Sequence, residues 1–295
     1  MSWEKVTLIG VGLLGGSLGQ ALRKRSLANS VVGLVRREES ITEAVACQAV
    51  DHATLNPGEA VQDADLVVLC TPLGRMASLT ATCVPFLRKD VILTDVGSAK
   101  RRVTDEMTAA LRDHSGVYLG SHPMAGKEKS GVAAACPDLF DGAACVVTPE
   151  TSTPDHVLER LCQLWEAVGC QVHKMAPSDH DKLVSRVSHL PHVLSSLLAS
   201  YVLDPREDSR QRLLCASGFR DTTRIAAGDV TMWRDILEQN PEAVTSAIDD
   251  FVELLSTFRN QIRQGDFQAI SETLEVAAKR RIEWGKGAAV IGGEA

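Results

Sequence analysis

One histidine of the sequence stands where it could accept a proton in a reaction. His122 lies in the run YLGSHPMAG, in which Ser121, His122 and Pro123 are predicted to form a loop directly after a short apolar strand. The carboxyl ends of strands in an open α/β sheet face the crevice in which such sheets bind ligands. An ordinary pKa of about 6.5 leaves a histidine largely neutral at physiological pH, so we predict that His122 is a general base.

A glycine-rich turn near the N-terminus indicates a nucleotide site. The sequence GVGLLG follows a predicted strand at residues 5–9 and opens a predicted helix that runs to about residue 25. Glycines permit a tight turn and a close approach of the backbone to a pyrophosphate, which the N-terminus of the helix attracts. The cofactor is predicted to contact this turn and a strand-end Thr-Pro turn, at Gly10, Gly12, Leu13, Leu14, Gly15, Thr71 and Pro72.

The residues after the second predicted strand bear on the choice of cofactor. An NAD-binding fold would place a carboxylate roughly 20 residues past the glycines, to bind the ribose 2′-hydroxyl. Val35 occupies that place, and Arg36 and Arg37 follow it. Two guanidinium groups can hold a 2′-phosphate, so we predict NADP as the preferred cofactor and NAD as the second choice. The alternative is that both arginines only cap a surface turn before Glu38 and Glu39.

A polar strip on a predicted helix supplies further candidates. Ser185 and His189 are four residues apart, as are Ser188 and His192, so each pair lies along one side of an otherwise apolar helix. Polar groups on a buried helix are costly unless they meet partners or line a cavity. The two histidines could suggest metal ligands, but no third ligand stands at a supporting spacing, so we predict no metal site.

These groups must be positioned by two kinds of structure. Strands and helices alternate through the first part of the chain, and continuous apolar runs such as DLVVLC are typical of parallel strands buried on both faces. The pattern becomes helical only from about residue 178. We therefore predict an α/β fold with an N-terminal Rossmann-type doubly wound sheet at residues 1–176 and a C-terminal all-helical domain at residues 177–295.

The predicted helical domain is built from long amphipathic segments. Apolar residues recur at the spacing of one helical face over residues 179–203, 242–263 and 267–283. Pro191 lies inside the first segment and should kink it, because proline has no backbone N–H to donate. The apolar stripe of the second segment is wide enough to pack on more than one helix. We therefore predict that this domain binds the substrate and forms a homodimer.

Composition excludes several classes of protein. The 295 residues are 44% hydrophobic and 23% charged, as in soluble globular proteins. The 31 basic and 38 acidic residues give a net charge of −7, which argues against a nucleic-acid partner. The N-terminus lacks the features of a signal peptide, and no segment approaches the roughly 18 apolar residues that span a bilayer. We expect a cytoplasmic protein with no membrane partner and eight scattered cysteines kept reduced.

Four motifs together resemble the prephenate/arogenate dehydrogenase family of tyrosine biosynthesis. They are DVGSAK at 95–100, GSHPMAG with a following EKSG at 120–131, SHLPH at 188–192, and FRDTTRIA with MWRDI within 219–236. The resemblance covers nearly the whole chain. It implies oxidative decarboxylation of prephenate or arogenate to 4-hydroxyphenylpyruvate or tyrosine, with hydride transfer to NAD(P). Some relatives append a regulatory ACT domain, for which this sequence has no room.

The resemblance also implies roles for residues that spacing alone would not select. Ser98 would hydrogen-bond the substrate hydroxyl or orient the catalytic histidine, although a serine before a helix is more often only an N-cap. The small anionic substrate would be bound by a carboxylate clamp, two residues of the polar strip and an aromatic wall, at Arg224, Ser188, His192 and Trp233. An arginine can pair two carboxylate oxygens and keeps its charge when desolvated.

Two rival functions fit parts of the sequence. A β-hydroxyacid or 6-phosphogluconate-type dehydrogenase shares the plan of a sheet followed by helices and uses a lysine early in its helical part, near which Lys182 stands; the glycine-flanked lysine motif of that class is missing. A catalytically silent NADP-sensing module would keep the glycine turn but would lose the base and the clamp. His122 and Arg224 are both present, which weighs against it.

Overall fold

The computed structural model describes residues 2–127 and 129–291, so Met1, Glu128 and residues 292–295 lie outside the description. Its main sheet has six strands in the order β3-β2-β1-β4-β5-β6, and every neighbouring pair is parallel. The strands are β1 (Trp3–Ile9), β2 (Ala28–Leu34), β3 (His52–Thr54), β4 (Leu66–Leu69), β5 (Ile92–Asp95) and β6 (Val117–Tyr118). This is the strand order of a Rossmann-type doubly wound sheet, as predicted from the sequence.

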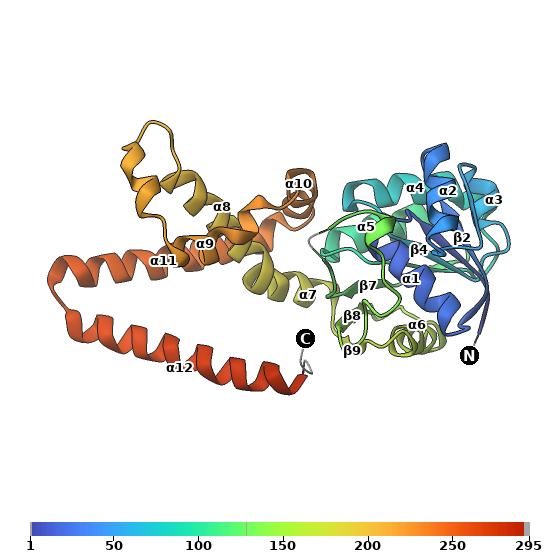
Figure 1. Ribbon diagram of the computed structural model, residues 1–295. Coiled ribbons are helices and arrows are strands. Elements are labelled where there is room, and N and C mark those ends of the chain that lie inside the picture. The colour runs from blue at the N-terminus through green and yellow to red at the C-terminus, as the bar shows by residue number, and fades with distance from the viewer. Residues whose placement is uncertain (1, 128, 292–295) are drawn as a thin grey trace. The chain divides into compact units, whose positions relative to one another are not determined.

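Helices cover both faces of this sheet (Figure 1). The helices of this part are α1 (Leu13–Lys24), α2 (Glu38–Ala46), α3 (Pro57–Val61), α4 (Met76–Cys83), α5 (Arg101–Ala110) and α6 (Asp155–Ala167). Alternate residues of β1 enter two separate apolar cores: Val6 and Leu8 pack with Leu18 of α1 and Leu161 of α6, and Ile9 packs on the other side. The second core contains apolar side chains of α3, α4 and α5. The apolar runs in the sequence therefore reflect burial on two faces.

A second, smaller sheet follows β6 and corrects one prediction. Its three strands are β7 (Gly120–Pro123), β8 (Ala144–Thr148) and β9 (Gln171–Lys174); β7 pairs antiparallel with β8, which pairs parallel with β9. The predicted loop at Ser121, His122 and Pro123 is thus a strand, in which His122 pairs with Val146. The prediction was wrong because Leu119 separates β6 from β7, and the antiparallel partner of β7 lies more than twenty residues further along the chain.

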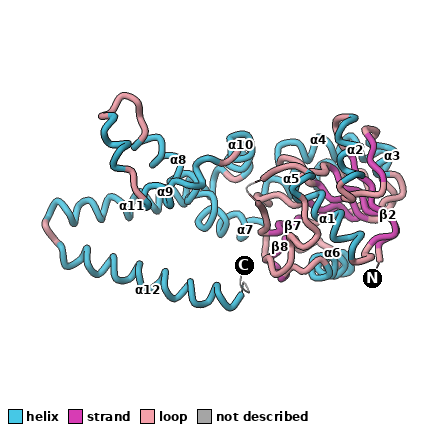
Figure 2. Tube along the Cα trace, in the orientation of Figure 1, coloured by secondary structure: helices cyan, strands magenta, loops and turns pink. Residues whose placement is uncertain are grey.

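From α7 (Pro177–Val184) onward the described chain contains helices and connections only (Figure 2). A π-helical turn, η4 (Ser185–His189), separates α7 from α8 (Leu190–Val202). Pro191 falls in the first turn of α8, directly after this π turn, and it has no backbone N–H to donate. The helix is therefore irregular where the sequence predicted a kink, and the kink itself stays a prediction. The following elements are η5 (Ser209–Leu214), α9 (Ser217–Thr223), η6 (Arg224–Ala227) and α10 (Val230–Gln239).

The chain divides into two compact units, at residues 1–241 and 242–295. The first unit holds both sheets and the helices through α10. The second unit contains α11 (Pro241–Gln264), whose first residue belongs to the first unit, and α12 (Phe267–Ile291). A turn joins the two helices, and in it Gly265 has a φ of +70°. A left-handed φ suits glycine, and it permits the tight reversal between the two helices.

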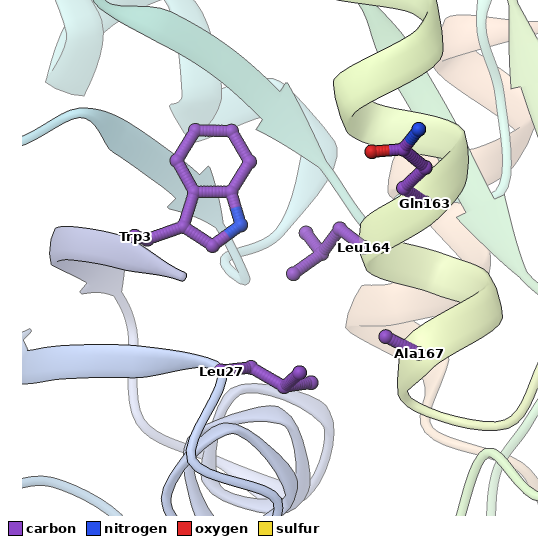
Figure 3. A pocket seen from close by; sticks show the side chains of 5 residues that line it. All are labelled: Trp3, Leu27, Gln163, Leu164 and Ala167. Atoms are coloured by element: carbon purple, nitrogen blue, oxygen red, sulfur yellow. The ribbon is translucent and has the colours of Figure 1, made fainter. Parts of the chain in front are cut away.

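An apolar hollow of about 200 Å³ lies at the start of β1 (Figure 3). Trp3 and Leu27 line one side of it, and Leu164 and Ala167 of α6 line the other. The Arg160 guanidinium lies 4.0 Å from the centre of the Trp3 ring. This hollow is at the opposite end of β1 from the glycine turn, and its lining residues are mostly apolar. The carboxyl ends of the strands are therefore the better candidate for the functional site.

Candidate functional site

A cavity of about 470 Å³ opens where the strand order reverses, at the carboxyl ends of β1 and β4. Its lining includes much of the predicted cofactor site: Gly10, Gly12, Arg36, Arg37, Thr71 and Pro72. Leu13, Leu14 and Gly15 form the first turn of α1 directly behind this lining. In doubly wound folds the crevice at the switch point is the place where dinucleotides bind. The structure therefore gathers the predicted residues around one cavity.

The glycines of the turn have the backbone freedom and the clearance that a dinucleotide needs. Gly10 has a φ of +92°, and a Cβ there would lie 2.8 Å from the backbone oxygen of Cys70. A Cβ on Gly15 would lie 2.2 Å from the oxygen of Gly10. Gly12 differs, because a Cβ there would meet nothing within 4 Å and would project into open space at the cavity. Gly10 and Gly15 thus allow the close backbone packing of the turn, and Gly12 leaves the surface of the turn open toward the cavity.

Three arginines line this cavity. Arg36 and Arg37 follow β2, and Arg75, at the end of η1 (Leu73–Arg75), lines the same cavity. Val35 lines it where an NAD-binding fold would carry a carboxylate, although Glu43 of α2 also belongs to the lining. Reasoning from the sequence missed Arg75. It lies about 40 residues after the other two arginines, and no local pattern connects it to them.

His122, the predicted base, is held by a hydrogen bond from the helical part of the same unit. Its Nδ1 lies 2.8 Å from Nε2 of His180 on α7, and the two rings meet edge to face with centroids 5.1 Å apart. His180 is fully buried, and its Nδ1 lies 2.8 Å from Oδ1 of Asp181. Burial, followed by the neighbouring His180 and Lys100, lowers the pKa of His122 well below 6.5. The imidazole of His122 is therefore neutral at pH 7, as a base must be.

A fully buried carboxylate ties the strand of His122 to the loop of Ser98. Asp95, at the end of β5, accepts hydrogen bonds from the Tyr118 hydroxyl at 2.8 Å and the Ser121 backbone N–H at 3.2 Å. It also forms an ion pair with Lys100, which is fully buried as well. The Gly97 N–H donates to its other oxygen at 2.9 Å. Both oxygens of the Asp95 carboxylate thus have partners, and the network holds the DVGSAK loop beside β7.

The second half of the site is built around the π turn. Asn240 donates to the backbone oxygen of Asp181 at 2.9 Å, and its side chain lies 3.4 Å from His189 Nδ1. The His189 ring meets Trp233 edge to face with centroids 6.2 Å apart. Trp233 in turn stacks on His192, with 3.5 Å between centroids and 7° between planes. Because Asp181 also bonds His180, these contacts form a continuous path from β7 to α8.

His192 has the properties of a ligand-binding group. Its Nδ1 is buried and has no hydrogen-bond partner among the residues that the structure describes, and the same holds for the Ser195 hydroxyl one turn further on. Burial lowers the pKa of His192. A buried polar atom without a partner is costly unless a ligand or water satisfies it. The stacking on Trp233 fixes the plane of the ring, so the free nitrogen has a defined direction.

The remaining predicted substrate residues lie on segments next to this pair. Ser188 is partly exposed on the π turn, four residues before His192. Arg224 is exposed at the start of η6, which packs on α8 and is followed by Gly228. A Cβ on Gly228 would lie 3.3 Å from the His192 ring, so this segment borders the histidine directly. Ser98 is partly exposed, and its backbone is close enough to His189 to influence the pKa of that ring, which burial lowers to about 4.

Reasoning from the sequence also missed His180, which contacts the predicted base, and Asp181, which contacts His180. They stand in the run DHDK, where attention falls on Lys182 as the lysine of the rival dehydrogenase class. Lys182 is exposed, whereas both of its predecessors are buried. The signal that could have found them is their polarity: a histidine and an aspartate at the start of an amphipathic helix, on the side that must be buried, require partners.

Within the described residues, no group of three or more histidine, cysteine, aspartate or glutamate side chains is arranged to hold a metal ion. The same part of the chain contains no helix that is long and apolar enough to cross a bilayer.

Comparison with known proteins connects this geometry to one family. The family profile described as prephenate dehydrogenase, nucleotide-binding domain, matches residues 18–174, and the profile described as prephenate dehydrogenase, dimerization domain, matches residues 176–276. Cyclohexadienyl dehydrogenase of Zymomonas mobilis is 32% identical over 95% of this chain and 96% of that protein.

Two solved structures are similar along nearly their whole length. Prephenate dehydrogenase from A. aeolicus, in complex with hydroxyphenyl propionate and NAD+, has a TM-score of 0.89 and 30% identity, covering 96% of this chain and 99% of that one. Synechocystis arogenate dehydrogenase has a TM-score of 0.83 and 28% identity, covering 95% of this chain and 99% of that one. The two profiles together match most of the chain, and these relatives are similar to it along nearly its whole length. The chain therefore belongs to the prephenate dehydrogenase family.

Proposed function

We propose that the protein catalyses the NAD(P)-dependent oxidative decarboxylation of prephenate or arogenate, to 4-hydroxyphenylpyruvate or tyrosine, in tyrosine biosynthesis. The observation that carries the proposal is the contact between His122 on β7 and His180 on α7. A neutral imidazole stands where the segment matched by the nucleotide-binding profile meets the segment matched by the dimerization profile. The names of the relatives supply the substrate class.

The reaction needs a base, a clamp for carboxylate groups and a nicotinamide held over the ring. Loss of hydride from the ring carbon that bears the hydroxyl, and loss of the ring carboxylate as carbon dioxide, make the ring aromatic, which drives the reaction. His122 would accept the hydroxyl proton, and Ser98 would orient that hydroxyl. The unpartnered Nδ1 of His192 would donate to a carboxylate or carbonyl, together with Ser188, and Trp233 would form a wall of the pocket.

Arg224 would act mainly on binding in this scheme. Its guanidinium can pair two oxygens of a carboxylate. A contact that holds the departing carboxylate equally well in the ground and transition states does not speed its loss. We therefore assign Arg224 to affinity and alignment, so that its loss would raise KM more than it lowers kcat.

The cofactor is NAD(P), and we propose that NADP is preferred. The supporting features are Arg36, Arg37 and Arg75 in the lining of the cavity, and Val35 in place of a carboxylate. The glycine turn would hold the pyrophosphate, and the bound nicotinamide would supply the hydride acceptor. Glu43 in the same lining is a feature that would favour a ribose hydroxyl, so the preference has to be measured.

We further propose a homodimer that forms through the helical part, with the boundary between the two domains at residues 176 and 177. The profile matches support this boundary, because one ends at 174 and the other begins at 176. Leu254, Leu255 and Ile262 of α11 and Leu274 and Ile282 of α12 are more than half exposed in the single chain. Exposed apolar side chains in such number on two helices are typical of a surface that a second subunit buries. The biosynthetic relatives support a cytoplasmic location.

Steady-state kinetics with purified protein test the proposal. Prephenate and arogenate are each supplied with NADP+ or NAD+, and formation of the reduced cofactor is followed by absorbance. The expected result is turnover of at least one substrate, with a lower KM for NADP+ than for NAD+. Failure of every combination would refute the function, whereas a lower KM for NAD+ would refute only the cofactor preference. Sedimentation of the same sample from micromolar concentrations upward should give a dimer, and a monomer throughout would refute the proposed assembly.

A further inference from the structure

The hydrogen bonds around His122 have a defined order. His122 Nδ1 meets His180 Nε2 at 2.8 Å, and His180 Nδ1 meets Asp181 Oδ1 at 2.8 Å. Both ring nitrogens of His180 are therefore engaged. The chain ends at a side chain whose two oxygens also receive backbone N–H groups at the start of α5: Lys100 donates to Oδ1 and Arg101 to Oδ2, each at 2.8 Å.

The donors at the end of the chain determine where each proton lies. A carboxylate can only accept hydrogen bonds, so His180 must donate from Nδ1. A neutral imidazole has one donor nitrogen and one acceptor nitrogen, so Nε2 of His180 is then an acceptor. His122 must donate to it from Nδ1, which leaves Nε2 of His122 without a proton. Burial lowers the pKa of both histidines, in agreement with two neutral rings.

The opposite arrangement is disfavoured by the same contacts. If Nε2 of His122 carried the proton, Nδ1 would be an acceptor and would need a donor from His180 Nε2. The neutral His180 ring would then turn an unprotonated Nδ1 toward the Asp181 carboxylate, so that two acceptors would face each other in a buried site. The other charged or titratable groups around these rings are Lys100, which is paired with Asp95, and His189 on the π turn.

We propose that His180 and Asp181 are positioning residues that fix the tautomer of His122, so that its Nε2 lone pair receives the substrate proton. The inference rests on the proposed function, in which His122 is the base. In the reaction, the hydroxyl O–H bond would break and an N–H bond would form at Nε2 of His122. The C–H bond of the carbon that bears the hydroxyl would break with loss of hydride, for which bound NAD(P)+ would supply the acceptor. The ring carboxylate would leave as carbon dioxide, and the electron pair of its bond would make the ring aromatic. The charge that develops on His122 is offset through His180 by the buried carboxylate of Asp181.

The tautomer can be observed directly by NMR on the full-length protein with bound NADP+. In protein labelled with 15N-histidine, two-bond 15N–1H correlations distinguish a protonated ring nitrogen from an unprotonated one. Signals of His122 are assigned by their loss in His122→Asn, and His156→Asn, at an exposed position on α6, serves as the matched control. At pH 7.5 we expect a proton on Nδ1 of His122 and none on Nε2. A proton on Nε2 would overturn the inference even in an active enzyme.

Two variants of His180 separate positioning from packing. His180→Gln keeps a carbonyl oxygen that can accept the bond from His122, whereas His180→Leu fills similar space without an acceptor. We expect His180→Gln to keep the tautomer and to lose at most about tenfold in kcat. His180→Leu should mix the two tautomers and lose about 100-fold in kcat with little change in the substrate KM.

Wild-type kcat in a folded His180→Leu variant would overturn the assignment. If that variant does not fold, as judged by circular dichroism, the wild-type tautomer and His180→Gln decide the question. An active His122→Asn variant has a different meaning, because it would remove His122 as the base and would leave the hydrogen-bond order intact.

Discussion

At the scale of single residues, the chemistry of this protein depends on side chains that burial keeps neutral or paired. His122 could be selected from the sequence as the candidate base, because its motif follows an apolar strand and resembles the motif of a known enzyme family. Its partner could not be selected, since His180 stands 58 residues away and the contact arises from packing between β7 and α7. In the same way, Arg36 and Arg37 were predictable from their place after β2, while Arg75 joins their cavity only through the fold.

The two arginines after β2 give a prediction at this scale. Because a guanidinium pairs with a phosphate through charge-assisted hydrogen bonds, Arg36→Ala and Arg37→Ala should each raise the KM for NADP+ by about tenfold. The same variants assayed with NAD+ are the control, and there KM should change less than about threefold. Equal effects on both cofactors would indicate that the arginines only shape the turn.

At the scale of elements, the strands and helices of the main sheet were predictable and the second sheet was not. Apolar runs and the glycine turn locate β1, α1 and β4, because these elements are defined by local patterns. The antiparallel pairing of β7 with β8 joins segments separated by a long connection, and no spacing in the sequence encodes it. Pro191 predicted an irregularity in its helix, but only the structure reveals a π turn that carries Ser188 and His189.

The glycine turn gives a prediction that separates folding from binding. An alanine Cβ at Gly10 would lie 2.8 Å from a backbone oxygen at a φ of +92°, so Gly10→Ala should lower the free energy of unfolding by about 2 kcal/mol. At Gly12 the added Cβ meets nothing within 4 Å, so Gly12→Ala should keep the stability of the wild type. It should still raise the KM for the cofactor about tenfold, because the methyl group occupies the space of the pyrophosphate.

Urea unfolding and cofactor titration of both variants check this pair. Gly218→Ala is the control, because a Cβ there also meets nothing within 4 Å. Gly218 lies in α9 and does not line the cofactor cavity, so this variant should change neither stability nor cofactor affinity. A Gly12→Ala variant with normal cofactor affinity would show that the turn does not approach the pyrophosphate.

At the scale of the whole molecule, the sequence predicted a sheet followed by helices but not how the chain is partitioned. The boundary predicted at residues 176 and 177 stays a prediction, and the two family profiles match residues 18–174 and 176–276. The first compact unit continues to residue 241, and within it Asp181 accepts hydrogen bonds from Lys100 and from Asn240, which lie far from it in the sequence. Such contacts depend on tertiary packing, and helical periodicity cannot reveal them.

Burial of several neutral histidines predicts a loss of stability in acid. The pKa of His189 falls from 6.5 to about 4 on folding, and the pKa values of His122 and His180 are also lowered, with burial as the largest cause in each case. Between these values the unfolded chain binds more protons than the native one, so the free energy of unfolding falls as the pH decreases from 6.5 to 4. His189 alone should contribute a loss of about 3 kcal/mol, at about 1.4 kcal/mol per pKa unit.

Urea unfolding at pH 7.5 and pH 4.0, at one fixed protein concentration, measures this dependence. His189→Gln should reduce the loss between the two pH values by most of that amount, and His156→Asn, at an exposed position, should leave it unchanged. An identical pH dependence in wild type and His189→Gln would mean that this histidine does not remain neutral when the protein folds.

The central claim is that His122 is the base of an oxidative decarboxylation. The most direct measurement follows single samples of purified protein with prephenate, or with arogenate, and NADP+, and quantifies carbon dioxide, reduced cofactor and aromatic product together. We predict equal amounts of all three, and a kcat about 10³-fold lower in His122→Asn with the protein still folded. Cofactor reduction without release of carbon dioxide, or wild-type turnover by His122→Asn, would contradict this account.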